Sequence, residues 1–278
     1  MTDMKGRVCI VTGANTGIGE VTARELARMG AHVLLACRSE DKTAPVVAAI
    51  RKQTGNDAVE FVPLDLGSLA SVRRCVEAFL ARDLPLHVLV NNAGLGGQRG
   101  VTEDGFELHF GVNHLGHFLL TVLLRDRLVR SAPARVVHVA SKAHFQASGI
   151  DFERVRGGTR SLTGMPEYAV SKLANVLFSA ELSKRLEGTR VSSYSLHPGV
   201  VASDIWRRIP FFVRPLVTAF MISTEEGART SLHCATAPDA QEQTGLYWDR
   251  CEPRNPSKPA RDAALAAELW ARSEAFVA

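Results

Sequence analysis

The stretch RVCIVTGANTGIGE, residues 7–20, decides the fold of this chain. Its first six residues are rich in β-branched and apolar side chains and predict a strand. Gly13, Gly17 and Gly19 follow with the spacing G-x-x-x-G-x-G, and a helical pattern begins at Gly17. Between a strand and a helix, such glycines permit a tight turn, close approach of a pyrophosphate and close helix packing. The stretch therefore predicts the first unit of a dinucleotide-binding α/β sheet.

The same turn carries further candidate ligands for a phosphate group. Asn15 and Thr16 offer side-chain donors, and the backbone at Ile18 opens the helix, where free N–H groups favour an anion. A glycine-rich turn that binds nothing is the structural alternative. No G-K-[ST] follows, so the sequence does not match a Walker A nucleotide site.

Strand and helix patterns alternate along the rest of the chain. Strands are expected at residues 7–12, 31–37, 59–65, 86–92, 134–141, 190–198 and 244–249. Helices are expected at 17–30, 41–54, 68–82, 165–186, 225–235 and 261–276, with one or two more within 102–130. This alternation predicts an α/β fold: one doubly wound Rossmann-type domain over 1–278, with a parallel sheet of about seven strands flanked by helices. Ligands of such sheets bind beyond the carboxyl ends of the strands.

Composition narrows the class of protein. Hydrophobic residues make up 46% and charged residues 22% of the 278 residues, as in a globular protein with a sizeable core. The net charge of +4 is mild and no basic run is interleaved with aromatics, so nucleic acid is not an expected partner. The five cysteines are scattered without a C-x-x-C pair, which favours a reducing compartment and no metal. With no signal peptide or membrane span in the sequence, we expect a cytoplasmic protein.

The end of the second strand predicts the cofactor. An acidic residue there would hold the adenosine ribose hydroxyls and repel a 2′-phosphate. In LLACRSE, Cys37 takes that place and Arg38 follows, which favours NADP(H) over NAD(H) because a guanidinium binds phosphate well. A plain surface arginine is the alternative. Asp65, at the end of the third strand, could accept from the adenine amino group, or could serve as a helix N-terminal acid with Ser68 as the competing cap.

Tyr168 and Lys172, in MPEYAVSKLANVLF (165–178), predict the chemistry. Residues four apart share one face of a helix. With three Tyr and seven Lys in the chain, this pair is expected by chance about 0.08 times. The pair suggests a proton donor beside a cation that tunes it, and half-buried packing is the alternative.

Together these motifs resemble the short-chain dehydrogenase/reductase family. The matches, in family order and over nearly the whole chain, are TGANTGIG, NNAG (91–94), Asn113 in GVNHLGHF, Ser141 in HVASKAH, Tyr168 and Lys172 in YAVSK, and Pro198 and Gly199 in LHPGVV. Within the family, CRS, NHLGHFLLT, YAVSKLANVLF and LHPGVV are most similar to the retinol dehydrogenase-like branch. That resemblance implies NADP(H) and carbonyl reduction.

The resemblance implies a role for each catalytic residue. Tyr168 would donate the proton, and the Lys172 cation would lower the pKa of Tyr168 and reach the nicotinamide ribose. Ser141 would donate to the carbonyl oxygen of the substrate. Asn113 would hold a water that relays protons to Lys172. Taken singly, Ser141 could be a strand-end serine and Asn113 a tolerated helix residue.

The resemblance also implies further cofactor contacts. These come from the backbone at Leu66, Asn92, Ala93, Gly94, Pro198, Gly199 and Val201 and from the hydroxyl of Ser203, whereas Asn91 braces the sheet. The insertion at 149–167, with Gly157, Gly158 and Gly164, is expected to be an exposed excursion. We expect His114 and His117 to pack and hydrogen-bond locally rather than bind metal, and His197 to be structural.

The substrate is predicted from residues 203–223. This segment would form a flap whose apolar side chains, Phe211, Phe212, Leu216, Phe220 and Met221, suggest a lipophilic aldehyde, ketone, alcohol or retinoid-like substrate. A subunit contact, buried packing or a membrane-surface contact are alternatives for the segment. For the whole protein, the alternatives are a non-catalytic nucleotide sensor or scaffold and a light-dependent C=C reductase. A homodimer or homotetramer through the long fourth and fifth crossover helices is possible by resemblance.

Overall fold

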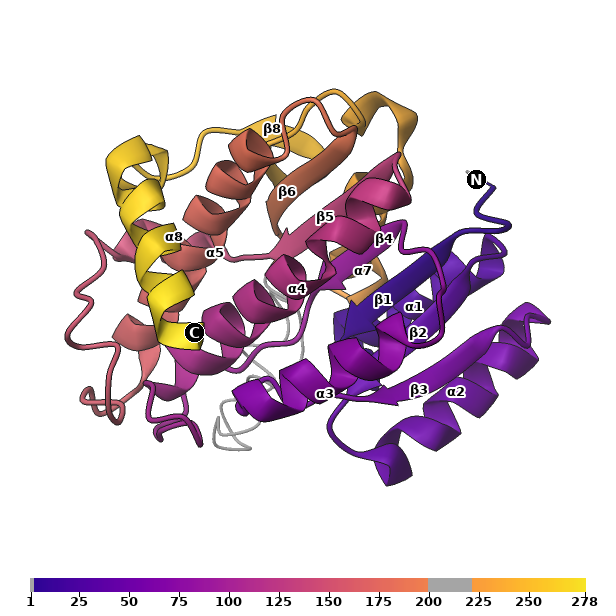
Figure 1. Cartoon of the computed structure of the whole chain (residues 1–278), viewed down its shortest axis with the longest axis horizontal. Helices are drawn as coiled ribbons and strands as arrows, with labels where there is room; N and C mark the ends of the chain where they lie inside the picture. The colour runs from indigo at the N-terminus through magenta and orange to yellow at the C-terminus, as the bar shows by residue number, and fades with distance from the viewer. Residues whose placement is uncertain (1–2, 200–221) are drawn as a thin grey trace.

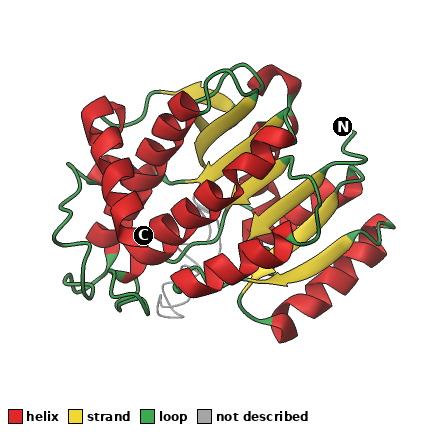
Figure 2. Ribbon diagram, viewed as in Figure 1, coloured by secondary structure: helices red, strands yellow, loops and turns green. Residues whose placement is uncertain are grey.

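The core of the molecule is one eight-stranded sheet. A computed structural model of the chain describes residues 3–199 and 222–278. The strand order is β3-β2-β1-β4-β5-β6-β7-β8, and all neighbouring pairs are parallel except β7 with β8. Figure 2 shows the strands side by side in one twisted sheet among the helices. The strands are β1 Val8–Thr12, β2 His32–Cys37, β3 Val59–Pro63, β4 Val88–Asn91, β5 Ala134–Val139, β6 Val191–His197, β7 Tyr247–Asp249 and β8 Glu252–Arg254. The predicted α/β class and all seven predicted strands are confirmed.

Helices cover both faces of the sheet. They are α1 Gly17–Arg28, α2 Glu40–Thr54, α3 Leu69–Leu80, α4 Gly116–Arg130, α5 Met165–Arg185, α7 Thr224–Thr236 and α8 Ala263–Val277. In Figure 1, α3, α4, α5 and α8 lie in front of the sheet, and α1 and α7 lie behind it. No helix in the described ranges is long and apolar enough to cross a bilayer.

Alternating strand residues divide the core into two halves. Along β1, Val8 and Ile10 pack with the residues of α3, α4, α5 and α8, whereas Cys9 and Val11 pack with those of α1 and α7. This follows from the period of two in a strand, which sends successive side chains to opposite faces. Because β1 to β7 are parallel, their carboxyl ends share one edge of the sheet, and those predicted catalytic and cofactor residues that the structure describes lie at that edge.

Local sequence sets several helix ends. Ser39 and Ser68 cap α2 and α3 by accepting from the backbone N–H three residues on, each at 3.4 Å. Asp262 caps α8 through the N–H groups of Ala264 and Leu265. Gly55 ends α2 with φ of +67°, a left-handed conformation that favours glycine.

The structure corrects the expected helix at 102–130. Residues 102–107 form a turn, because Gly105 adopts φ of +80° and donates to Thr102 O, and Val101 then pairs with Glu107. The helix proper begins as a π-helical stretch, η1 Phe110–Leu115, and continues as α4. π-helical turns are rare and are often found at functional sites.

Two further differences concern segments without a strong periodic pattern. The edge strand β8 was not expected, since its Glu-Pro-Arg sequence is exposed and proline is tolerated only at a sheet edge. The insertion at 149–167 is not a fully exposed excursion: Val155 and Thr159 are buried. Its backbone pairs with residues 100–107 through contacts that sequence spacing does not reveal.

Helix α8 covers the outer side of α5. Trp270 of α8 packs edge-on against Phe118 of α4 with ring centroids 5.1 Å apart, and Phe178 of α5 lies 5.7 Å from the same indole. Arg185, in the last turn of α5, stacks over Trp270 at 4.2 Å. As a result, part of the surface through which an oligomer was expected is occupied by the chain's own C-terminal helix (Figure 1).

Candidate active site

The glycine turn leaves no room for side chains on its inner side. Gly13 and Gly17 have φ of +63° and +62°. A Cβ on Gly19 would lie 2.4 Å from both Gly13 O and Asn92 Nδ2, whereas a Cβ on Gly17 would meet nothing within 4 Å. The turn is therefore closed against the sheet and open on its outer side, at the start of α1. This is the geometry that a pyrophosphate requires.

A chain of buried hydrogen bonds connects this turn to the residues that follow β4, the neighbouring strand in the sheet. Thr12 Oγ1 accepts from the backbone N–H of Asn92 and Ala93, each at 2.9 Å, and lies 2.9 Å from His117 Nε2. The Asn92 side chain donates to Thr12 O at 2.8 Å. Asn92 and Ala93 thus build the floor of the site with their backbone, and the Asn92 amide is used within the protein.

The end of β2 presents a thiol and a guanidinium. Burial raises the pKa of the Cys37 thiol, and hydrogen bonds from Thr43 and from the backbone of the glycine turn partly oppose this rise. Arg38 is exposed next to it. Among the described residues no hydrogen bond or ion pair holds the Arg38 side chain. It is therefore available to an anion at this edge.

Asp65 and Leu66 follow β3. Asp65 Oδ1 accepts from Gly67 N at 2.8 Å, while Ser68 rather than Asp65 caps α3. Leu66 is buried, and its carbonyl oxygen lies 2.5 Å from where a Cβ on Gly116 would stand. One Asp65 oxygen is thus occupied by its own loop, and the Asp65 side chain remains half-exposed.

Tyr168, Ser141 and Lys172 meet at the carboxyl end of β5. Ser141 follows β5, and the other two lie on the first turns of α5. The Ser141 hydroxyl lies near enough to the Tyr168 phenol to act against the rise of its pKa. Lys172 Nζ donates to Val139 O at 2.8 Å and lies 5.6 Å from the centre of the Tyr168 ring. The fold therefore brings together three side chains that are up to 31 residues apart in sequence.

Burial controls the ionisation of this pair. Desolvation raises the pKa of Tyr168, and the hydrogen bond with Ser141 acts in the opposite direction. Desolvation also lowers the pKa of Lys172 to about 8. The expected lowering of the Tyr168 pKa is therefore not found in the protein by itself, because loss of hydration outweighs the neighbouring groups.

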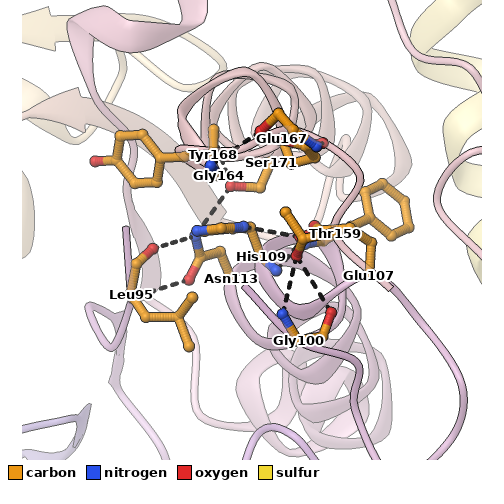
Figure 3. Close-up of polar contacts among 12 residues, drawn as sticks. Leu95, Gly100, Glu107, His109, Asn113, Thr159, Gly164, Glu167, Tyr168 and Ser171 are labelled. Carbon is orange, nitrogen blue, oxygen red and sulfur yellow. Dashed lines mark hydrogen bonds and ion pairs between the residues drawn. The ribbon is translucent and has the colours of Figure 1, made fainter. Parts of the chain in front are cut away.

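Asn113 lies in η1 and faces the same place. Its Oδ1 accepts from Leu95 N at 2.9 Å, and its Nδ2 donates to Leu95 O at 3.0 Å and to Ser171 Oγ at 2.9 Å (Figure 3). A Cβ on Gly94 would lie 3.4 Å from both Asn113 Oδ1 and Lys172 Nζ. Asn113 and Lys172 thus flank Gly94, while the Asn113 amide is held firmly by protein groups.

Some of the other residues named from the sequence hydrogen-bond within the protein, and others lie outside the described residues. Asn91 Nδ2 donates to Thr121 Oγ1 at 2.9 Å and bridges β4 and α4. His114 pairs with Ser273 Oγ at 2.9 Å, and His197 Nδ1 accepts from Lys142 N. Gly199, after Pro198, has φ of +95°. Val201, Ser203 and residues 203–221 of the expected flap, with its five apolar side chains, lie outside the described residues.

Four polar residues around the site were not singled out from sequence. Glu107, His109 and Thr159 form a buried cluster beside Tyr168, and Ser171 links Asn113 to Tyr168 O (Figure 3). The only sequence signal is a glutamate and a histidine inside the apolar run FELHFGV, since nothing local connects them to Thr159, 52 residues further on.

Comparisons with known proteins identify the family of the chain. A family model of the short chain dehydrogenases matches residues 7–152. Retinol dehydrogenase 12 of Mus musculus is 48% identical over 95% of this chain and 84% of its own length. A crystal structure of an uncharacterized protein from Mycobacterium paratuberculosis, 35% identical, matches with a TM-score of 0.81 over 100% of this chain and 95% of that one.

A third relative was solved with a cofactor. The Pseudomonas aeruginosa RhlG/NADP active-site complex is 25% identical, with a TM-score of 0.72 over 95% of this chain and 98% of that one. The glycine turn, the meeting of Tyr168 with Ser141 and Lys172, and these similarities over nearly the whole length lead to one assignment. This chain belongs to the short-chain dehydrogenase/reductase family, in its retinol dehydrogenase-like branch.

Proposed function

We propose that this protein is an NADP(H)-dependent oxidoreductase that transfers a hydride between nicotinamide and a lipophilic carbonyl or alcohol. The observation that carries the proposal is that Ser141 acts on the buried Tyr168 phenol, one helical turn from Lys172, at the same carboxyl edge of the sheet as the glycine turn. When bound, NADPH supplies the hydride, and this chain supplies the proton and the orientation. We take the chain to be one cytoplasmic domain, with residues 203–223 as its substrate flap.

The residues around the carboxyl edge fit a dinucleotide. The open outer side of Gly17 would take the pyrophosphate, and Lys172 would hold the nicotinamide ribose. Arg38 would bind a 2′-phosphate, and Asp65 would accept from adenine. The backbone of residues 92–94 and 198–199, together with Val201 and Ser203, would line the nicotinamide side.

The proton chemistry follows from burial. A raised pKa keeps the Tyr168 phenol protonated at neutral pH, so in the reducing direction it holds the proton that the substrate oxygen needs. As that proton leaves, negative charge develops on the phenol oxygen. The Ser141 hydroxyl stabilises this charge by donating to it, and the Lys172 ammonium lies within range to do the same.

The substrate class is supported by two observations. Relatives at up to 48% identity carry the name retinol dehydrogenase, and the segment expected to cover the site is apolar. We therefore expect the purified protein to oxidise NADPH in the presence of medium-chain, aromatic or retinoid-like aldehydes. Loss of NADPH absorbance is the measurement. A protein that binds NADPH but turns over no member of a broad carbonyl panel would be a sensor or scaffold instead.

Cofactor choice is tested separately by Arg38→Asp. The carboxylate would repel a 2′-phosphate, so we expect the ratio of kcat/KM with NADPH to that with NADH to fall by about a hundredfold or more, since charge-assisted phosphate contacts are strong. Arg130→Asp, the same charge change at the opposite edge of the sheet, is the control and should leave the ratio unchanged. An unchanged ratio in Arg38→Asp would remove the phosphate role from Arg38.

A further inference from the structure

A buried carboxylate lies close to α5, the catalytic helix that carries Tyr168 and Lys172, and takes no part in the proposed chemistry. Glu107 is 2% exposed, and four hydrogen bonds converge on it. Its Oε1 accepts from His109 Nδ1 at 2.9 Å and from Thr159 Oγ1 at 2.5 Å, and its Oε2 accepts from the backbone N–H of His109 and Phe110, each at 2.9 Å (Figure 3). Every acceptor position of a carboxylate is thereby used. Burying such a group is costly unless it is fully paired, so this cluster is a built feature of the fold.

Glu107 fastens the insertion to the body of the protein. Residues 155–159 run alongside 100–107 through three backbone hydrogen bonds: Glu107 N to Val155 O, Gly157 N to Gly105 O and Thr159 N to Gly100 O, at 2.8, 2.8 and 3.0 Å. The Thr159 side chain, 7% exposed, adds the bond to the Glu107 carboxylate from inside this ribbon.

A second carboxylate holds the next residues. Glu167, immediately before Tyr168, accepts from the backbone N–H of Ser161 at 2.8 Å and of Arg160 at 3.2 Å, and from the Ser161 hydroxyl. These hydrogen bonds with Ser161 lower the pKa of Glu167 although its partial burial raises it. Residues 159–161 are therefore held by two carboxylates, that of Glu107, just before η1, and that of Glu167 on α5.

The cluster touches Tyr168 through His109. The His109 ring is fully buried and stands edge-on to the Tyr168 ring, with centroids 6.1 Å apart and planes at 70°. A Cβ on Gly164 would lie 2.9 Å from His109 Cε1 and 2.3 Å from Gln98 O. Gly164 in turn accepts from Tyr168 N at 2.9 Å. In Figure 3 the phenol oxygen points away from His109, so the cluster bears on the ring and backbone of Tyr168 and not on its reacting atom.

We propose that Glu107, His109 and Thr159 are positioning residues that lock the insertion onto the first turn of α5 and thereby set the position of the Tyr168 phenol. This inference rests on the proposed function, in which Tyr168 delivers the proton. Its physical basis is that proton transfer requires hydrogen-bond distance in the reacting complex, and a displacement of about 1 Å costs on the order of a hundredfold in rate. The lock raises kcat without contacting cofactor or substrate.

The test compares three changes in the lock with a matched control. Thr159→Val removes the hydroxyl at nearly constant shape, Thr159→Ser restores it, and Glu107→Gln turns an amide N–H toward groups that are themselves donors. The control is Ser273→Ala: Ser273 lies on α8, and its hydroxyl makes a buried hydrogen bond with His114 of η1, which does not involve the insertion. For each variant, kcat, the Kd for NADPH by fluorescence, Tm and amide hydrogen exchange of residues 157–172 are measured.

We expect kcat to fall by about tenfold in Thr159→Val and about a hundredfold in Glu107→Gln, with the Kd for NADPH unchanged within about twofold. Amide hydrogen exchange of residues 157–172 should become faster in both variants. In Thr159→Ser, kcat and the exchange rate should both return to the wild-type values. Ser273→Ala should lower Tm without altering kcat or exchange in 157–172. If Glu107→Gln fails to fold, Thr159→Val decides by itself.

Three results would overturn the inference: unchanged kcat in Thr159→Val, a fall in kcat without faster exchange, or an equal fall in Ser273→Ala. Failure of the proposed function has a different signature. If the wild-type protein reduces no carbonyl, the exchange measurements still decide whether Glu107 and Thr159 lock the catalytic helix. Unchanged exchange in Thr159→Val would then reject the lock, and faster exchange with recovery in Thr159→Ser would uphold it.

Discussion

Replacing Tyr168 by phenylalanine should abolish turnover while leaving the protein folded and able to bind NADPH. The substitution removes only the hydroxyl, the group on which Ser141 acts. Without it no side chain in that position can deliver the proton. We expect kcat to fall by about a thousandfold, within the range that a positioned general acid contributes.

Two measurements make this result specific. Titration with NADPH, followed by its fluorescence, should give a Kd within about twofold of the wild-type value, since a change of that size is under 0.5 kcal/mol. Tyr247→Phe is the matched control. Tyr247 is buried, and its hydroxyl has no hydrogen-bond partner in the described part of the chain, so its removal should cost no activity. Full activity in Tyr168→Phe would refute the assignment of the proton donor.

The Lys172→Met variant should be inactive and yet no less stable than the wild type. Burial lowers the pKa of Lys172 from 10.5 to about 8, so at pH 7 the folded protein carries an ammonium in an unfavourable place. Methionine fills similar space without the charge, although Val139 O loses its donor. We expect the free energy of unfolding at pH 7 to rise by on the order of 1 kcal/mol, and kcat to fall by about a hundredfold or more.

The lowered pKa of Lys172 also determines in which direction stability and activity change with pH. Because the pKa of Lys172 is lower in the folded than in the unfolded state, the unfolded state binds more protons between about pH 8 and 10.5. The Lys172 contribution to stability therefore increases as pH rises through that window, and the advantage of Lys172→Met should shrink there. Activity should move the opposite way in the wild type and decline above about pH 8, as the ammonium is lost.

Differential scanning calorimetry from pH 7 to 10 and a pH profile of kcat/KM test these two claims. Lys184→Met is the control, because this lysine lies on the same helix with its side chain 56% exposed and should change neither property. A clear loss of stability in Lys172→Met at pH 7 would show that the Lys172 ammonium is net stabilising, contrary to the desolvation argument.

Much of the fold was predictable because its signals are local. The strands β1 to β5 are short runs rich in β-branched and apolar residues, the crossovers between them are long enough for helices, and the glycines at 13, 17 and 19 stand where strand passes into helix. Parallel strands send their carboxyl ends to one edge, so Ser141, Tyr168 and Lys172 could be expected to meet before any contact was known.

The predictions that failed depended on long-range contacts. The insertion looks like a loop in sequence, with glycines at 157, 158 and 164, but it is pinned by hydrogen bonds to residues about 50 positions earlier. The turn at 102–107 interrupts a helical pattern because it pairs with that insertion. Local propensity cannot report a partner that is distant in the chain.

By itself, then, the sequence determined the order of strands and helices, the glycine turn and the identity of the residues at the carboxyl edge. Only the tertiary structure decided the pKa values of those residues and the contacts that hold their side chains in place. Packing removes water from Tyr168 and Lys172, which raises one pKa and lowers the other, and it brings Glu107 to Thr159 and His109 to the Tyr168 ring. Desolvation and contacts between distant segments arise from the folded shape as a whole, and no spacing of residues along the chain encodes them directly.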